Sequence, residues 1–116
     1  MRYELLQPIS HQDAILAEGG MPEQLAHAII SVGLHDEDSA WAEWYCIRLA
    51  AHTSPVVRRA VMLAFAHLAR RFGELCEDRV RPLVEAELAD ADVRREADGA
   101  ADDFEVYLKW RVTRPV

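Results

Sequence analysis

Five histidines, at positions 11, 27, 35, 52 and 67, are the side chains best suited to metal or acid–base chemistry in this chain of 116 residues. No two of them are three or four positions apart, and there is no His-Glu-x-x-His motif of the kind that binds zinc on a helix. His35 with Asp36 and Asp38 is the best local group, but a solvated turn that caps the next helix explains it more simply. We therefore expect no metal and no cofactor.

The two cysteines, Cys46 and Cys76, offer a nucleophile only if one of them meets a histidine in space. A disulfide between them stays open, although two buried, reduced thiols are the expected arrangement in a cytoplasmic protein. The adjacent carboxylates Asp102 and Asp103 diverge by about 100° on a helix, so they are poorly placed to share a substrate. The Gly19-Gly20 pair lacks the rest of a phosphate-binding loop. We expect that the chain is not an enzyme.

Helix-forming residues dominate the chain, and no segment alternates with the period of a strand. The first segment contains Glu4, Pro8 and His11 in place of a long apolar run, so we expect no signal peptide. No window is apolar enough to span a membrane. We expect a cytoplasmic, all-α protein with a single domain over residues 1–116. The predicted helices cover residues 11–18, 22–34, 39–52, 54–73, 78–89 and 93–110.

The helix over residues 54–73 is predicted to be the centre of the fold. Ser54 is a suitable N-cap, and Pro55 occupies the first helical position, where the missing N–H costs nothing. Arg70 and Arg71 lie in the last turn, where their positive charges interact favourably with the negative end of the helix dipole. Gly73 is typical of a residue that ends a helix. The residues between are apolar on nearly every side, so other helices must enclose this helix.

An internal repeat supports a stacked arrangement of these helices. A Val-Arg-Arg triplet follows a turn twice, beginning at Val57 and at Val93, and Ala64 and Ala100 keep the same register. This pattern resembles HEAT-like repeats, which implies a short HEAT-like α–α superhelix of five to six antiparallel helices. The resemblance also implies a structural ladder between arginines and turn aspartates. Its candidate members are Arg58, Arg94, Asp90 and Asp92.

The order of short motifs resembles a narrower group, small bacterial HEAT-like proteins. The motifs are Leu34-His35-Asp36, Trp41-Ala42-Glu43, Val57-Arg58, Leu68-Ala69-Arg70 and Ala101-Asp102-Asp103. Some of these proteins are immunity proteins of contact-dependent inhibition and related polymorphic toxin systems. The resemblance implies an acidic, cytoplasmic, non-catalytic inhibitor that blocks a toxin domain, often a nuclease.

The charge of the chain favours a basic protein as partner. The net charge is −7, which disfavours nucleic acid as a ligand. Acidic residues outnumber arginines between Glu74 and Glu105, and this run is either a solvated helix face or a patch for a basic protein. Three aromatic residues adjoin on one predicted helix and serve either the core or an interface. The candidate partner-binding residues are Glu85, Glu87, Asp98, Asp102, Asp103, Glu105, Trp41, Trp44 and Tyr45.

The first functional hypothesis is therefore an immunity protein, itself monomeric, that forms a heterodimer with a basic toxin domain. It contacts neither nucleic acid nor a membrane. The alternatives are a HEAT-like enzyme or cofactor-handling protein, glycosylase-like or lyase-like, and a scaffold or adaptor built from repeats.

Overall fold

The computed structural model describes residues 6–115, and this part of the chain is all-α. It contains six α-helices and no strand, which confirms the predicted fold class. A short 3₁₀ turn, Ala17–Gly19, follows α1, and a π-helical turn, Phe104–Leu108, follows α6. The helices are α1 (His11–Leu16), α2 (Pro22–His35), α3 (Ser39–Leu49), α4 (Pro55–Phe72), α5 (Glu77–Glu87) and α6 (Arg94–Asp103).

Local capping signals set most helix boundaries. Ser10 Oγ accepts a hydrogen bond from the Asp13 N–H at 3.0 Å, and the Asp38 carboxylate caps α3 in the same way. Gly73 ends α4 in the left-handed region, with φ 64°. Ser54 is the N-cap residue of α4 and Pro55 the first helical residue, as predicted, but the Ser54 side chain makes no capping hydrogen bond and its N–H donates to His52 Nδ1.

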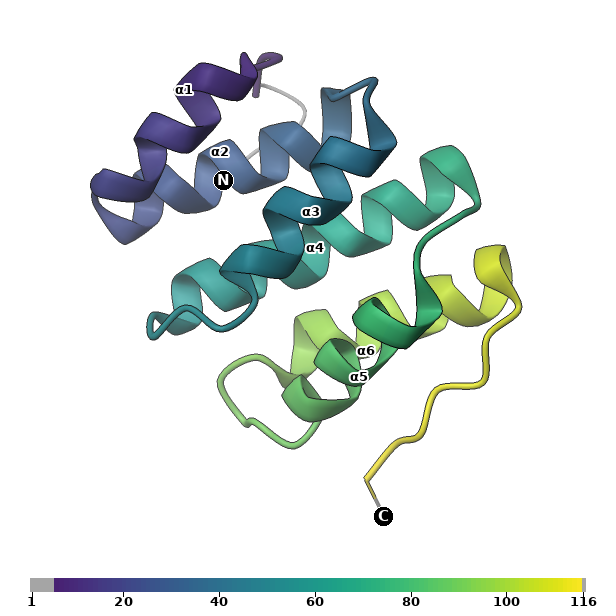
Figure 1. Cartoon of the computed structure of the whole chain (residues 1–116). Coiled ribbons are helices and arrows are strands. Elements are labelled where there is room, and N and C mark those ends of the chain that lie inside the picture. The colour runs from purple at the N-terminus through teal and green to yellow at the C-terminus, as the bar shows by residue number, and fades with distance from the viewer. Residues whose placement is uncertain (1–5, 116) are drawn as a thin grey trace.

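The six helices form two layers (Figure 1). In one layer α2, α4 and α6 lie side by side, with α4 in the middle. In the other layer α3 packs against α4 and α5 packs against α6, while α1 covers the start of the array beside α2. Three consecutive helix pairs thus share one core, as expected for stacked helical units. The assignment of these pairs to HEAT repeats stays a prediction.

Helix α4 lies at the centre of the core, as predicted. Half of its residues are buried, because helices contact it from three sides. Each large apolar side chain that is fully buried stabilises the fold by about 1.5–3 kcal/mol relative to exposure. The buried residues of α4 are Val57, Ala60, Val61, Met62, Ala64, Phe65, Ala66, Leu68 and Ala69.

Helices α2 and α4 approach each other closely at Gly33. A Cβ atom at this position would lie 2.7 Å from the Ala64 Cα atom, so only glycine fits. Near the same point Arg71 donates to the carbonyl oxygens of Gly33, at 2.7 Å, and Asp36, at 2.6 Å. These bonds satisfy carbonyl groups at the C-terminal end of α2 that have no partner inside the helix.

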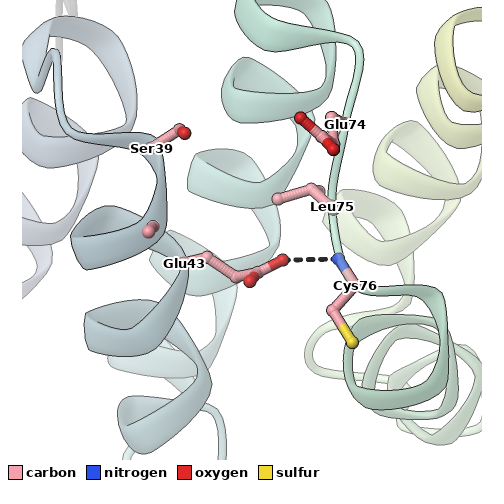
Figure 2. A pocket seen from close by; sticks show the side chains of 6 residues that line it. Ser39, Glu43, Glu74, Leu75 and Cys76 are labelled. Carbon is pink, nitrogen blue, oxygen red and sulfur yellow. Dashed lines mark hydrogen bonds between the residues drawn. The ribbon is translucent and has the colours of Figure 1, made fainter.

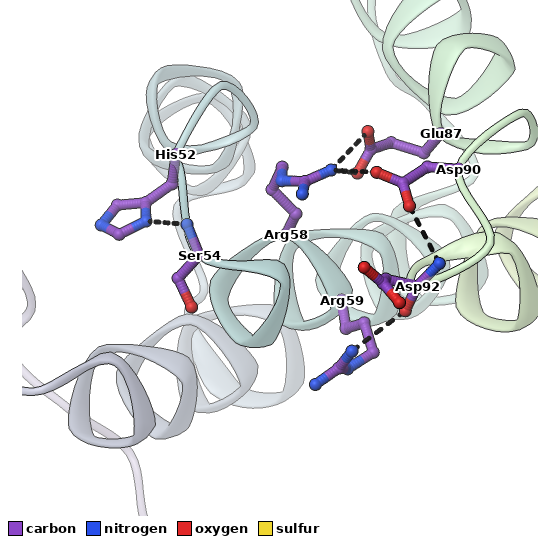
Figure 3. A network of polar contacts seen from close by, with 7 residues as sticks. All are labelled: His52, Ser54, Arg58, Arg59, Glu87, Asp90 and Asp92. Carbon is purple, nitrogen blue, oxygen red and sulfur yellow. Dashed lines mark hydrogen bonds and ion pairs between the residues drawn. The ribbon is translucent and has the colours of Figure 1, made fainter.

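The other end of α4 is held by the predicted arginine ladder, but only in part (Figure 3). Arg58 donates to the carboxylates of Glu87, at 3.1 Å, and Asp90, at 2.9 Å, which confirms the pairing of Arg58 with Asp90. The hydrogen bond from Arg58 lowers the pKa of Asp90 below its ordinary value. The same pairing predicted for Arg94 is wrong, since its Nε donates to the Leu88 carbonyl oxygen at 3.2 Å. Two arginines therefore tie α4 to the α5–α6 turn, because Arg59 also donates to the Asp92 carbonyl oxygen, at 3.0 Å.

The Gly33 contact predicts opposite effects of the same substitution at two helical glycines. Gly33→Ala should lower the free energy of unfolding by about 1–3 kcal/mol, because the new methyl group meets the backbone of α4. Gly99→Ala in α6 should raise it by about 1 kcal/mol, since its Cβ meets nothing within 4 Å and alanine is the better helix former. Urea denaturation measures both. Equal effects at the two sites would contradict the close packing of α2 on α4.

His67 on α4 predicts a loss of stability in mildly acidic solution. Burial, followed by the charges of Arg70 and Arg71, lowers the pKa of His67 from 6.5 to about 4. Between these values the unfolded chain binds the proton more readily, so stability falls as the pH falls through this window. His67→Gln removes this titration, so the melting temperature of the variant should fall less than that of the wild type between about pH 7 and about pH 5. An identical loss in both proteins would show that His67 is not responsible.

Candidate functional site

The aromatic residues of α3 divide between core and surface. The Trp41 ring stacks on His11 of α1, with centroids 3.7 Å apart, and on Tyr45, at 5.0 Å. Tyr45 is fully buried, and its hydroxyl donates to the Ala14 carbonyl oxygen at 2.7 Å. Burial raises the pKa of this hydroxyl, which therefore stays protonated. Tyr45 is thus a core residue, while Trp44 is the member of the group that is 46% exposed.

Trp44 is exposed but held in place. The Arg48 guanidinium lies 4.6 Å from the centre of the Trp44 ring, which is a favourable cation–π position. Arg48 is fixed in turn by two hydrogen bonds to the Glu18 carboxylate, at 2.9 and 3.0 Å. An exposed aromatic ring whose neighbours are already ordered loses little entropy when a partner covers it.

Three of the predicted acidic residues do come together, and the C-terminal tail occupies them. Arg114 binds Asp98 at 3.0 Å, Asp102 at 2.8 Å and Glu105 at 2.9 Å. We call Asp98, Asp102 and Glu105 the acidic cluster. One arginine faces three carboxylates, so the cluster remains anionic with the tail in place. It is consequently still able to attract a basic protein.

Two further contacts hold the tail beside α5 and α6 (Figure 1). Val112 is buried, and the Thr113 N–H donates to the Glu85 carboxylate at 2.7 Å. The chain turns back toward these helices at Lys109, which adopts a left-handed conformation with φ 60°. Glu85 thus adjoins the acidic cluster, but its carboxylate already accepts a bond from the tail.

The remaining two acidic candidates pair with arginines of α4 and not with Arg114. Glu87 pairs with Arg58, and Asp103 pairs with Arg70 at 3.3 Å. Burial raises the pKa of Asp103 above its ordinary value. The six predicted carboxylates therefore do not form one free patch, because each has a partner within the chain.

A groove between α4 and α6 was not predicted from the sequence. A cavity of about 430 Å³ lies between these helices, and a second of about 110 Å³ continues toward α2. Both are lined by Leu63 and Glu96, so they form one surface, which we call the α4–α6 groove. The only sequence signal for it is Gly99, a glycine inside a helix. The groove residues are Ala26, Ile30, Val56, Arg59, Ala60, Leu63, Ala66, Arg70, Arg95, Glu96, Gly99, Ala100 and Asp103.

A third cavity, of about 340 Å³, lies where α3 meets the link between α4 and α5 (Figure 2). Ser39 and Glu43 of α3 face Glu74 and Cys76 across it. Glu43 accepts a hydrogen bond from the Cys76 N–H at 2.6 Å, which caps the start of α5 from a neighbouring helix.

The cysteines are both free, and only one matches the expected burial. Cys46 is buried, and burial raises the pKa of its thiol, which stays protonated and is therefore a poor nucleophile. Cys76 is exposed, so the prediction of two buried thiols is wrong for it. It lies at the N-cap of α5, where the chain leaves the core.

Within residues 6–115, no group of three or more histidine, cysteine, aspartate or glutamate side chains is arranged to hold a metal ion. None of the helices in this part of the chain is both long and apolar enough to cross a lipid bilayer.

One solved structure provides a comparison for this fold. The chain is similar to a chain in the crystal structure of a CDI complex from Cupriavidus taiwanensis LMG 19424, with a TM-score of 0.79 and 24% sequence identity. The match covers 92% of this chain and 97% of that chain, so the two share a fold over almost their whole length. No protein-family model matches the chain, and no curated protein sequence does.

The contacts of the tail predict that Arg114 keeps it ordered. Arg114→Ala removes all three ion pairs, so backbone amides from Arg111 to Arg114 should exchange hydrogen faster than in the wild type. Arg111→Ala is the matched control, since Arg111 is exposed and makes no ion pair within residues 6–115. Hydrogen exchange with mass spectrometry measures both variants. Unchanged exchange in Arg114→Ala would mean that Val112 and Thr113 suffice to hold the tail.

Proposed function

We propose that this chain is an immunity protein that binds and neutralises the toxin domain of a contact-dependent inhibition system. The observation that carries the proposal is the fold shared with a chain of a CDI complex, since the match extends over 97% of that chain. A likeness of this extent covers the whole layered array and not one helix pair. The resemblance of the short sequence motifs to immunity proteins points the same way.

The partner that we propose is a basic toxin domain, bound by one copy of this chain in the cytoplasm. The net charge of −7 and the anionic acidic cluster would attract such a domain and raise its association rate. Trp44, which is exposed and held by Arg48, is a suitable aromatic contact for the interface. The role as an enzyme and the role as a scaffold have no comparable support among the described residues.

The test begins with the tagged chain as bait in a lysate of its native organism. A captured domain that stops growth when expressed alone, and no longer does so when co-expressed with this chain, supports the proposal. If the captured partner is harmless in this assay, or if co-expression leaves its toxicity unchanged, the proposal is wrong. Titration of the purified pair at about 0.1 M and about 1 M salt then measures the electrostatic contribution.

Neutralising the acidic cluster should slow association with the toxin domain by about tenfold at low salt and reduce the salt dependence. The variant is Asp98→Asn, Asp102→Asn and Glu105→Gln together. The control neutralises three exposed carboxylates outside the cluster and so changes the net charge equally. It combines Glu23→Gln, Glu37→Gln and Asp78→Asn. Stopped-flow binding measures both rates. Equal rates would show that net charge, and not the cluster, attracts the partner.

A further inference from the structure

We propose that the α4–α6 groove receives a helix of the toxin domain, and that this helix carries a carboxylate on its apolar face. The inference rests on the proposed function and adds the surface and the chemistry of the segment that binds there. Three features of the groove carry it: its shape, the glycine in its wall, and the arginines along its edges.

The shape of the groove suits a helix. It follows α4 from Val56 to Arg70, which at 1.5 Å per residue is about 20 Å, or about four helical turns. Its walls are helices, whose backbone groups are already bonded within each helix, so an extended segment would find no strand edge to pair with. A helix satisfies its own backbone hydrogen bonds and needs only an apolar surface. Small residues such as Ala66 and Gly99 in its lining let the axis of a bound helix approach closely.

Gly99 is a residue that the fold of this chain does not explain. Glycine inside a helix lowers helix stability, yet a Cβ atom at Gly99 would meet nothing within 4 Å. At Gly33, by contrast, the same atom would collide with Ala64, so that glycine is required by the packing of α2 on α4. The missing side chain at Gly99 keeps the groove open at the middle of α6. We infer that the space is used by a partner.

The groove carries more arginines than acidic residues, whereas the chain as a whole is negatively charged. Arg95 is exposed and makes no hydrogen bond or ion pair among residues 6–115. Arg59 donates only to the Asp92 carbonyl oxygen in this part of the chain, at 3.0 Å, so no carboxylate neutralises it. Arg70 is paired with Asp103, and Glu96 is the other acid of the groove. A chain of net charge −7 therefore presents here a surface with more arginines than acids, which favours a carboxylate on the bound helix.

The first test fills the groove. Gly99→Leu places a side chain in the open space and should weaken binding of the toxin domain by about 100-fold, the loss expected when a central contact is blocked. Gly19→Leu is the matched control, because a Cβ atom at Gly19 also meets nothing within 4 Å and the residue lies outside the groove. It should bind as the wild type does. Circular dichroism confirms that both variants remain helical, and isothermal titration measures affinity.

The second test reverses the charge of the groove and remains decisive if Gly99→Leu does not fold. Arg95→Glu should weaken binding by about tenfold or more, because the carboxylate on the partner helix would then face another carboxylate. Arg79→Glu on α5 changes the net charge equally at an exposed arginine outside the groove and should have a smaller effect.

The outcomes separate the two proposals. If the wild type neutralises the toxin domain while Gly99→Leu and Arg95→Glu bind it as tightly as their controls do, the groove is not the binding surface and the proposed function stands. If the wild type captures no toxin domain, both proposals are wrong. A loss of affinity confined to the two groove variants supports both.

Discussion

The contact of α2 with α4 at Gly33 is the constraint on which the rest of the structure depends. The two helices approach so closely that no side chain fits between Gly33 and Ala64. Because α4 is held there, its other faces are free to receive α3 and α6, and nearly every large side chain between them is buried. Arg71 fixes one end of α4 to α2, and Arg58 fixes the other end to the α5–α6 turn.

Many of the charged side chains of this protein pair with one another. Arg58, Arg70 and Arg114 together engage five of the carboxylates that were predicted to face a partner. Ion pairs of this kind at the surface contribute little stability individually, but they determine where unbalanced charge remains. The unbalanced charge is negative at the acidic cluster and positive along the α4–α6 groove.

Helix α6 contributes residues to both the acidic cluster, which we propose attracts the toxin domain, and the α4–α6 groove, which we propose binds it. Asp98 and Asp102 bind Arg114 of the tail, whereas Arg95, Gly99 and Asp103 line the α4–α6 groove. Long-range attraction depends on total charge and is tolerant of geometry, while a groove that takes one helix depends on shape. A single helix of ten residues would thus contribute to both the rate and the specificity of binding.

The sequence by itself determined the helices and the central place of α4, because caps, prolines and apolar periodicity act within a few residues of each other. The resemblance to HEAT-like repeats placed Arg58 and Asp90 among four candidates for a ladder, and the structure pairs these two but not Arg94. Only the tertiary structure decided that Tyr45 is buried, that Cys76 is exposed and that Arg114 occupies the acidic cluster. These outcomes depend on segments far apart in the chain, whose side chains meet only after the layers have packed. The α4–α6 groove is of the same kind, since a gap between two helices exists only when both are in place.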